Sequence, residues 1–159
     1  MAATLAVLYS AIAVALPLLL PVFTFEQPTG PYNIGTVTYD WKDEMREELN
    51  TAEPDDKREL MVQIWYPASP SAKGNKAPYD AYPDIFEDGY SQALHMPKML
   101  FKNLGLIKTR AVERAELSDT APAYPVLLFS HGFNGVKNQN TFQIEQLASH
   151  GYIVIGIDP

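Results

Sequence analysis

Uncharged, apolar residues fill the start of the chain. The first 25 residues contain no Asp, Glu, Lys, Arg or His, and residues 2–25 read AATLAVLYSAIAVALPLLLPVFTF. A helix needs about 20 apolar residues to cross the hydrocarbon core of a bilayer. We therefore predict an apolar N-terminal helix in residues 1–25, acting as a transmembrane helix or signal anchor whose orientation the flanking charges do not determine. A cleaved signal peptide and a buried core helix are the alternatives.

Two segments with the composition of strands follow the apolar segment. Residues 26–35 (EQPTGPYNIG) are rich in Pro and Gly, which predicts a linker. Residues 36–41 (TVTYDW) and 60–66 (LMVQIWY) are β-branched and aromatic, and Pro67 ends the second run. The charged segment at 42–57 predicts a solvated turn, so the two strands should form an antiparallel pair.

A long Pro-rich segment separates these strands from the C-terminal part. Residues 67–123 contain six prolines and predict an irregular insert within a domain that spans 36–159. Inside the insert, residues 96–106 (MPKMLFKNLGL) have the pattern of a short amphipathic helix whose apolar side chains serve packing. We see no repeat and no low-complexity tract.

The last 36 residues predict a strand, a helix and a second strand. Residues 124–130 (YPVLLFS) and 152–158 (YIVIGID) are continuous apolar runs, as in buried strands of parallel sheets. Between them, residues 140–150 carry apolar positions at helical spacing, and Gly151 is a typical residue at a helix end. This pattern predicts a right-handed βαβ unit and therefore an α/β fold, with antiparallel strands first.

Composition and charge exclude several classes of function. The 159 residues are 47% hydrophobic, as in a globular domain. The absence of Cys excludes a disulfide scaffold, a thiolate zinc site and a cysteine nucleophile. A net charge of -7 argues against nucleic-acid binding, which needs a basic surface.

The candidate for chemistry is the loop between the two C-terminal strands, His131-Gly132-Phe133-Asn134-Gly135. Open α/β sheets bind ligands at the carboxyl ends of strands, and glycines let the backbone approach a ligand closely. The loop has neither the G-x-G-x-x-G nor the G-K-[ST] pattern of nucleotide sites, which disfavours a nucleotide-binding unit. It fits the loop after the third strand of an α/β-hydrolase, whose backbone N–H lines the oxyanion hole.

Three stretches carry a resemblance to a known family. Residues 62–68 (VQIWYPA), 124–135 (YPVLLFSHGFNG) and 147–158 (LASHGYIVIGID) resemble the plasma platelet-activating-factor acetylhydrolase family of α/β-hydrolases, which includes lipoprotein-associated phospholipase A2. The resemblance covers residues 36–159, weakly across the insert. It implies cleavage of short acyl esters of lipids, or of simpler esters, by Ser, His and Asp without metal or cofactor. It also implies oxyanion stabilisation by the backbone N–H of Phe133, with His131, Gly132, Asn134 and Gly135 supporting the loop.

The chain departs from the family pattern at the nucleophile. No G-x-S-x-G elbow occurs in it, although the fold places the nucleophile there, followed by Asp and then His. Ser130 and His131 are adjacent at a strand end and should point to opposite faces, so they are not expected to form a catalytic pair. Asp158 ends a strand and could resemble a triad acid, but it precedes any elbow, which argues against that role. His95 and His150 are most simply a loop residue and a helix-end residue.

We therefore interpret the chain as the N-terminal fragment of a membrane-anchored or exported serine ester hydrolase of phospholipase A2 type. The nucleophile, acid and base are absent from it, so the chain alone should be inactive and poorly soluble. The alternative is a non-catalytic, membrane-tethered interaction module on an α/β scaffold.

Overall fold

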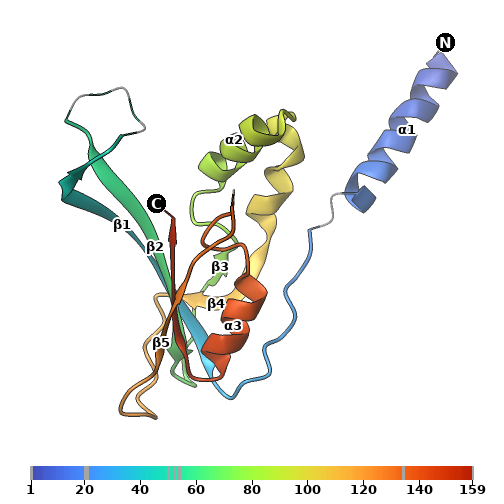
Figure 1. The fold of residues 1–159 in the computed structure, drawn as a ribbon. Helices are drawn as coiled ribbons and strands as arrows, with labels where there is room; N and C mark the ends of the chain where they lie inside the picture. Colours follow the sequence, from blue (N-terminus) through green and yellow to red (C-terminus); the bar gives the residue numbers. More distant parts are fainter. Residues whose placement is uncertain are drawn as a thin grey trace. The chain divides into compact units, whose positions relative to one another are not determined.

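The computed structural model describes residues 2–19, 22–49, 51, 53, 55–133 and 135–158. The chain divides into two compact units, Met1–Thr24 with Pro78–Lys108 and Phe25–Ala77 with Thr109–Pro159, and each is described by itself. The elements are α1 (Ala2–Leu19), β1 (Asn33–Glu47), β2 (Lys57–Ala68), β3 (Lys76–Pro78), α2 (Pro83–Leu94), two 3₁₀ helices (Lys98–Leu100 and Lys102–Leu106), β4 (Lys108–Glu113), β5 (Val126–Phe129), α3 (Thr141–Ser149) and β6 (Ile153–Asp158) (Figure 1).

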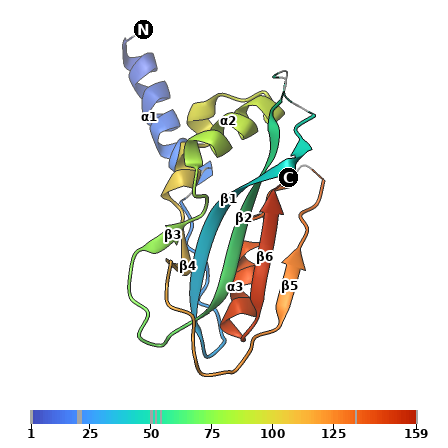
Figure 2. The same cartoon turned by 90° about the vertical axis from the view of Figure 1, so that its left-hand side faces the viewer.

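The second unit is built around a mixed sheet. Its strand order is β3-β4-β1-β2-β6-β5, which Figure 2 shows nearly face-on. Strands β1 and β2 pair antiparallel from Asn33 opposite Ala68 to Asp43 opposite Arg58, which confirms the predicted antiparallel pair. Strand β6 runs antiparallel to β2 and parallel to β5.

The predicted strand–helix–strand unit is confirmed as β5, α3 and β6. Helix α3 packs against β1, β2 and β6 on one face of the sheet, and Gly151 ends it with a φ of 95°. A left-handed φ favours glycine, because a Cβ is strained there. The core between the helix and the sheet is formed by Ile34, Trp65, Ala111, Ile144, Ala148 and Val154. The α/β fold class follows.

Strand β5 differs from its sequence prediction. Its apolar run predicted a central, fully buried strand, but β5 lies at the edge of the sheet and Leu128 is 76% exposed. In the part of the chain that the structure describes, β5 pairs with β6 alone. The apolar composition of β5 suits a strand with a neighbouring strand on each side, but β5 has one on one side, so its other, apolar edge is uncovered.

Self-association should follow from this uncovered edge. An apolar edge strand offers unpaired N–H and C=O groups to other chains, and a charged side chain blocks that pairing. Leu128→Lys should therefore raise the protein concentration at which the chain remains monodisperse in light scattering. The control is Met99→Lys, which adds the same charge at a side chain 66% exposed outside the sheet. Equal behaviour of both variants would show that the edge does not cause association.

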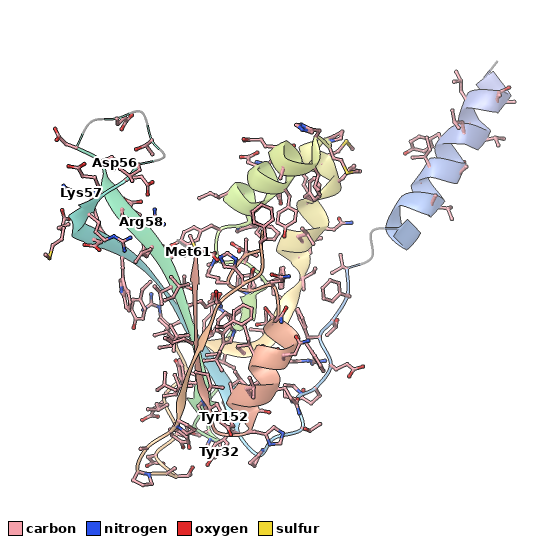
Figure 3. The ribbon with its side chains drawn as sticks, viewed as in Figure 1. Tyr32, Asp56, Lys57, Arg58, Met61 and Tyr152 are labelled. Carbon is pink, nitrogen blue, oxygen red and sulfur yellow. The ribbon has the colours of Figure 1, made fainter. Side chains whose placement is uncertain are left out.

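The charged segment between β1 and β2 is largely strand rather than turn. β1 continues to Glu47 and β2 begins at Lys57, with an irregularity in register between Asp43 and Glu47. The hairpin thus extends past the residues that pair with β6, and Asp56, Lys57 and Arg58 lie near its outer end (Figure 3). Arg58 and Glu48 form an ion pair of 3.4 Å there.

The insert at 67–123 contains regular elements, which differs from the irregular segment predicted. It holds β3, α2 and β4, and the predicted helix at 96–106 is two 3₁₀ helices instead. Pro83 lies at the start of α2, where proline suits a helix because its missing N–H is not needed. In the first unit, burial raises the pKa of Tyr79 to about 12, and its ring lies 6.1 Å from that of Phe86.

The transmembrane prediction for residues 1–25 is not supported. Helix α1 has 18 residues, from Ala2 to Leu19. Over the described ranges, none of the helices is long and apolar enough to cross a membrane.

The predicted linker packs against the last turn of α3. The N–H of Gly30 donates to Ser149 Oγ at 3.1 Å, and the N–H of Tyr32 donates to the Ser149 carbonyl at 3.1 Å. A Cβ on Gly30 would lie 2.0 Å from the Ser149 carbonyl oxygen. No side chain larger than hydrogen fits at Gly30 while this contact is kept.

Two glycine-to-alanine substitutions should therefore have opposite effects on stability. Gly30→Ala forces the linker away from Ser149 and should lower the free energy of unfolding by about 1–3 kcal/mol. Gly89→Ala lies within α2, where an added Cβ meets no atom within 4 Å. It should raise the free energy of unfolding by about 0.5–1 kcal/mol, since Ala has the higher helix propensity. Urea titrations followed by circular dichroism measure both, and equal effects would contradict the steric argument.

Candidate active-site loop

The glycine loop connects the carboxyl end of β5 to the start of α3. β5 ends at Phe129 and α3 begins at Thr141. The structure describes His131, Gly132, Phe133 and Gly135 of the predicted site, whereas Asn134 lies outside the described residues. The loop therefore lies at the carboxyl ends of the parallel strands, where α/β folds bind ligands.

Phe133 lies in a tight turn and its side chain is 98% exposed. The N–H of Gly135 donates to the Gly132 carbonyl at 2.8 Å, which closes a four-residue β-turn. This bond uses neither polar backbone group of Phe133. The turn thus presents an apolar side chain and a backbone N–H that its own closure does not occupy.

The two glycines of the turn have different reasons to be glycine. A Cβ on Gly135 would lie 2.9 Å from the Gly132 carbonyl oxygen and 2.1 Å from Gln139 Oε1, so the turn leaves no room for one. A Cβ on Gly132 would meet only Gln139 Oε1, at 4.0 Å. Gly135 is therefore required by the close packing of the turn, and Gly132 is not.

His131 stands at the start of the loop. Its Nδ1 donates to the Gly132 carbonyl at 2.9 Å, and its Nε2 lies 3.9 Å from Asp158 Oδ1. The ring therefore connects the turn to the end of β6.

Lys137 stands at the other end of the loop and contacts the same carboxylate. Its Nζ lies 3.0 Å from Asp158 Oδ2, and its backbone N–H donates to Asp158 Oδ1. Its side chain is only 2% exposed. Sequence reasoning considered Asp158 only as a triad acid and missed Lys137, because no local pattern marks a pair 21 residues apart.

The remaining histidines follow helices α2 and α3. His95 ends α2, in the first unit, with a φ of 52°. His150 follows α3, and its Nε2 lies 3.2 Å from Thr29 Oγ1. Within the described residues, no group of three or more His, Cys, Asp and Glu side chains could hold a metal ion.

Comparisons with known proteins bear on the whole domain. A family model described as "Platelet-activating factor acetylhydrolase, isoform II" matches residues 21–158. Among solved structures, the chain is similar to ferulic acid esterase from Streptomyces cinnamoneus, with a TM-score of 0.63 and 30% sequence identity. The match covers 86% of this chain and 36% of the esterase, so this chain spans about a third of that protein's length. No curated protein matches the chain.

Proposed function

Because the chain belongs to the platelet-activating factor acetylhydrolase, isoform II, family, we propose that it supplies the oxyanion-stabilising part of a serine ester hydrolase. The family and the similar esterase both support ester hydrolysis. The observation that carries the proposal is the turn at 132–135. The hydrogen bond that closes this turn does not use the N–H of Phe133, and the turn follows the carboxyl end of β5, where the fold binds ligands. The reaction is acyl transfer to Ser and then to water.

In the first step, the serine oxygen attacks the ester carbonyl carbon while a His accepts the serine proton. The carbonyl oxygen gains negative charge, and the N–H of Phe133 donates to it together with the N–H of the residue after the nucleophile. The C–O bond then breaks, and the leaving alcohol takes the proton from His. Water hydrolyses the acyl-serine by the same sequence and releases a carboxylate.

The nucleophile, base and acid come from sequence outside these 159 residues. The similar esterase is far longer than this chain, which supports this division. The chain alone is then inactive, because a hydrogen-bond donor without a nucleophile does not cleave an ester. The apolar segment before residue 21, where the family match begins, serves export of the protein.

The substrate is a lipid with a short acyl ester. Phe133 is apolar and 98% exposed beside the proposed donor, so its ring is available to contact the acyl group. A phospholipase A2-type activity on short chains follows if the ring limits the length of the acyl group. A phospholipid with a 2-acetyl group should then be hydrolysed faster than one with a 2-palmitoyl group.

The first test is to read the coding sequence beyond codon 159 and to express the complete protein. A G-x-S-x-G segment followed by Asp and His is expected, together with labelling of its serine by a fluorophosphonate probe and hydrolysis of p-nitrophenyl acetate. The 159-residue chain is the control and should not label. A complete protein that neither labels nor hydrolyses esters would contradict the proposal and favour an interaction module.

A further inference from the structure

We propose that Asp158 fastens both ends of the glycine loop and thereby positions the N–H of Phe133. This inference rests on the proposed function of the loop. Asp158 is thus a positioning residue that acts through His131 and Lys137, rather than a member of the triad. Neither the family match nor the similar esterase assigns it this role.

The contacts of the carboxylate carry the proposal. On the side that precedes the turn, His131 Nε2 lies 3.9 Å from Asp158 Oδ1. On the side that follows the turn, Lys137 reaches the same carboxylate twice, through its backbone N–H and through its Nζ at 3.0 Å. One side chain therefore lies 3.9 Å from His131, which precedes the turn, and forms hydrogen bonds with Lys137, two residues after the turn.

The strand that carries Asp158 is well held. β6 lies between β2 and β5, and Asp158 is opposite Met61 of β2 in the register (Figure 3 labels Met61). By contrast, Phe133 is almost fully exposed and lies in a turn. Because β6 has a neighbouring strand on each side, contacts from Asp158 to both ends of the loop should restrict the motion of the loop.

Gly156 is a second feature of β6 that helps to hold the end of the loop in place. Gly156 and Asp158 are two residues apart in a strand, so they face the same side. A Cβ on Gly156 would lie 3.0 Å from the Lys137 carbonyl oxygen and 3.2 Å from Lys137 Cβ. The missing side chain at Gly156 thus lets the Lys137 backbone rest on the strand while Asp158 holds it.

Charge and burial make the pair with Lys137 specific. The Lys137 side chain is 2% exposed, and a buried ammonium needs an anionic partner because its desolvation is costly. The Asp158 side chain is 25% exposed, so the carboxylate is more accessible to solvent than the lysine that it pairs with. Alanine at this position would leave Lys137 Nζ without this carboxylate.

The expected consequence concerns the transition state. An oxyanion donor works when it is already aimed at the position where charge develops. Misplacement by about 1 Å can lower a rate by about 10²-fold. Because the donor acts on charge that appears only in the transition state, loss of positioning should lower kcat and leave KM nearly unchanged.

The experiment compares Asp158→Ala with Asp88→Ala in the complete protein. Asp88 forms a 2.9 Å pair with Lys98 in the other unit and has no place in the loop, so it controls for loss of an ion pair. Asp158→Ala should speed hydrogen–deuterium exchange in residues 131–139 and lower kcat by about 10–10²-fold at similar KM. Asp158→Asn should recover part of both, because its carboxamide oxygen still accepts the Lys137 N–H.

If Asp158→Ala does not fold, Lys137→Met provides the test, since it removes the Nζ contact and keeps the backbone N–H. It should speed exchange at the end of the loop near residue 137. Exchange in 131–139 equal to that of the wild type and Asp88→Ala would overturn the proposal. If the wild type is active and Asp158→Ala has the same kcat, the proposal is also overturned. An inactive wild type would contradict only the proposed function, because the exchange measurement does not depend on activity.

Discussion

Replacing Phe133 by proline should lower kcat of the complete hydrolase by about 10²–10³-fold, the usual effect of removing one oxyanion donor. Proline has no backbone N–H, so the substitution removes the proposed donor itself. The side chain is 98% exposed, so its loss removes no packing from the core. The bond from Gly135 to the Gly132 carbonyl involves neither polar backbone group of residue 133, and proline is common at the second position of such turns.

Phe133→Ala is the matched control for this substitution. It keeps the N–H and removes the ring, so it should raise KM for the acyl ester through the lost contact, without the large fall in kcat. Steady-state kinetics on p-nitrophenyl acetate separate the two parameters. If Phe133→Ala and Phe133→Pro lower kcat equally, the side chain rather than the N–H matters and the oxyanion role is wrong.

The largest loss of stability should come from Glu145→Ala. The carboxylate of Glu145 on α3 is buried, and its Oε1 accepts the N–H of Arg110 at 2.8 Å and that of Ala111 at 2.7 Å. Both donors belong to β4, so the side chain joins the helix to that strand. A buried N–H left without an acceptor costs about 1–3 kcal/mol, so two of them should lower the free energy of unfolding by about 2–6 kcal/mol.

Glu145→Gln separates the hydrogen bonds from the charge. The glutamine oxygen can accept from the same two N–H groups, so this variant should lose much less stability than Glu145→Ala. Urea titrations of both variants measure the difference. If the two variants were equally destabilised, the carboxylate charge rather than its acceptor role would account for the loss.

The difference in stability between the wild type and Glu145→Gln should depend on pH. Burial raises the pKa of Glu145 above its ordinary value of 4.5, against the opposing effect of the N–H groups of Ala111 and Arg110. The folded chain therefore binds the proton more tightly than the unfolded chain does. Relative to Glu145→Gln, the wild type should be most stable below pH 4.5 and should lose that advantage as the pH rises through the folded pKa. Urea titrations from pH 4 to pH 8 that run parallel would contradict this expectation.

Local patterns predicted the elements whose signals are local. The apolar run at 152–158 and the helical spacing at 140–150 became β6 and α3, because a βαβ unit forms from consecutive sequence. The helix at Pro83–Leu94 lies in a segment whose prolines indicate irregular structure, although a proline at the first helical position is compatible with a helix. The edge position of β5 depends on which strands surround it, and no pattern within β5 records that.

The candidate loop could be predicted, but not what holds it. The glycine spacing and the family resemblance mark residues 131–135 from the amino-acid sequence alone. The pair Lys137–Asp158 joins residues 21 positions apart. Its formation depends on the placement of the loop over β6, which only the folded sheet determines. Contacts of this kind belong to tertiary structure and carry no sequence spacing of their own.

The packing of Gly30 against Ser149 has a consequence for how the chain folds during synthesis. The two residues are 119 positions apart, so the ribosome must synthesise all of the intervening sequence before they meet. At about 5–20 residues per second, synthesis of this stretch takes about 6–24 seconds. The β1–β2 hairpin, whose contacts are local, is complete long before α3 and β6 emerge. Both edges of the hairpin therefore stay unpaired until β4 and β6 are made, and that interval is when a chaperone would engage the nascent protein.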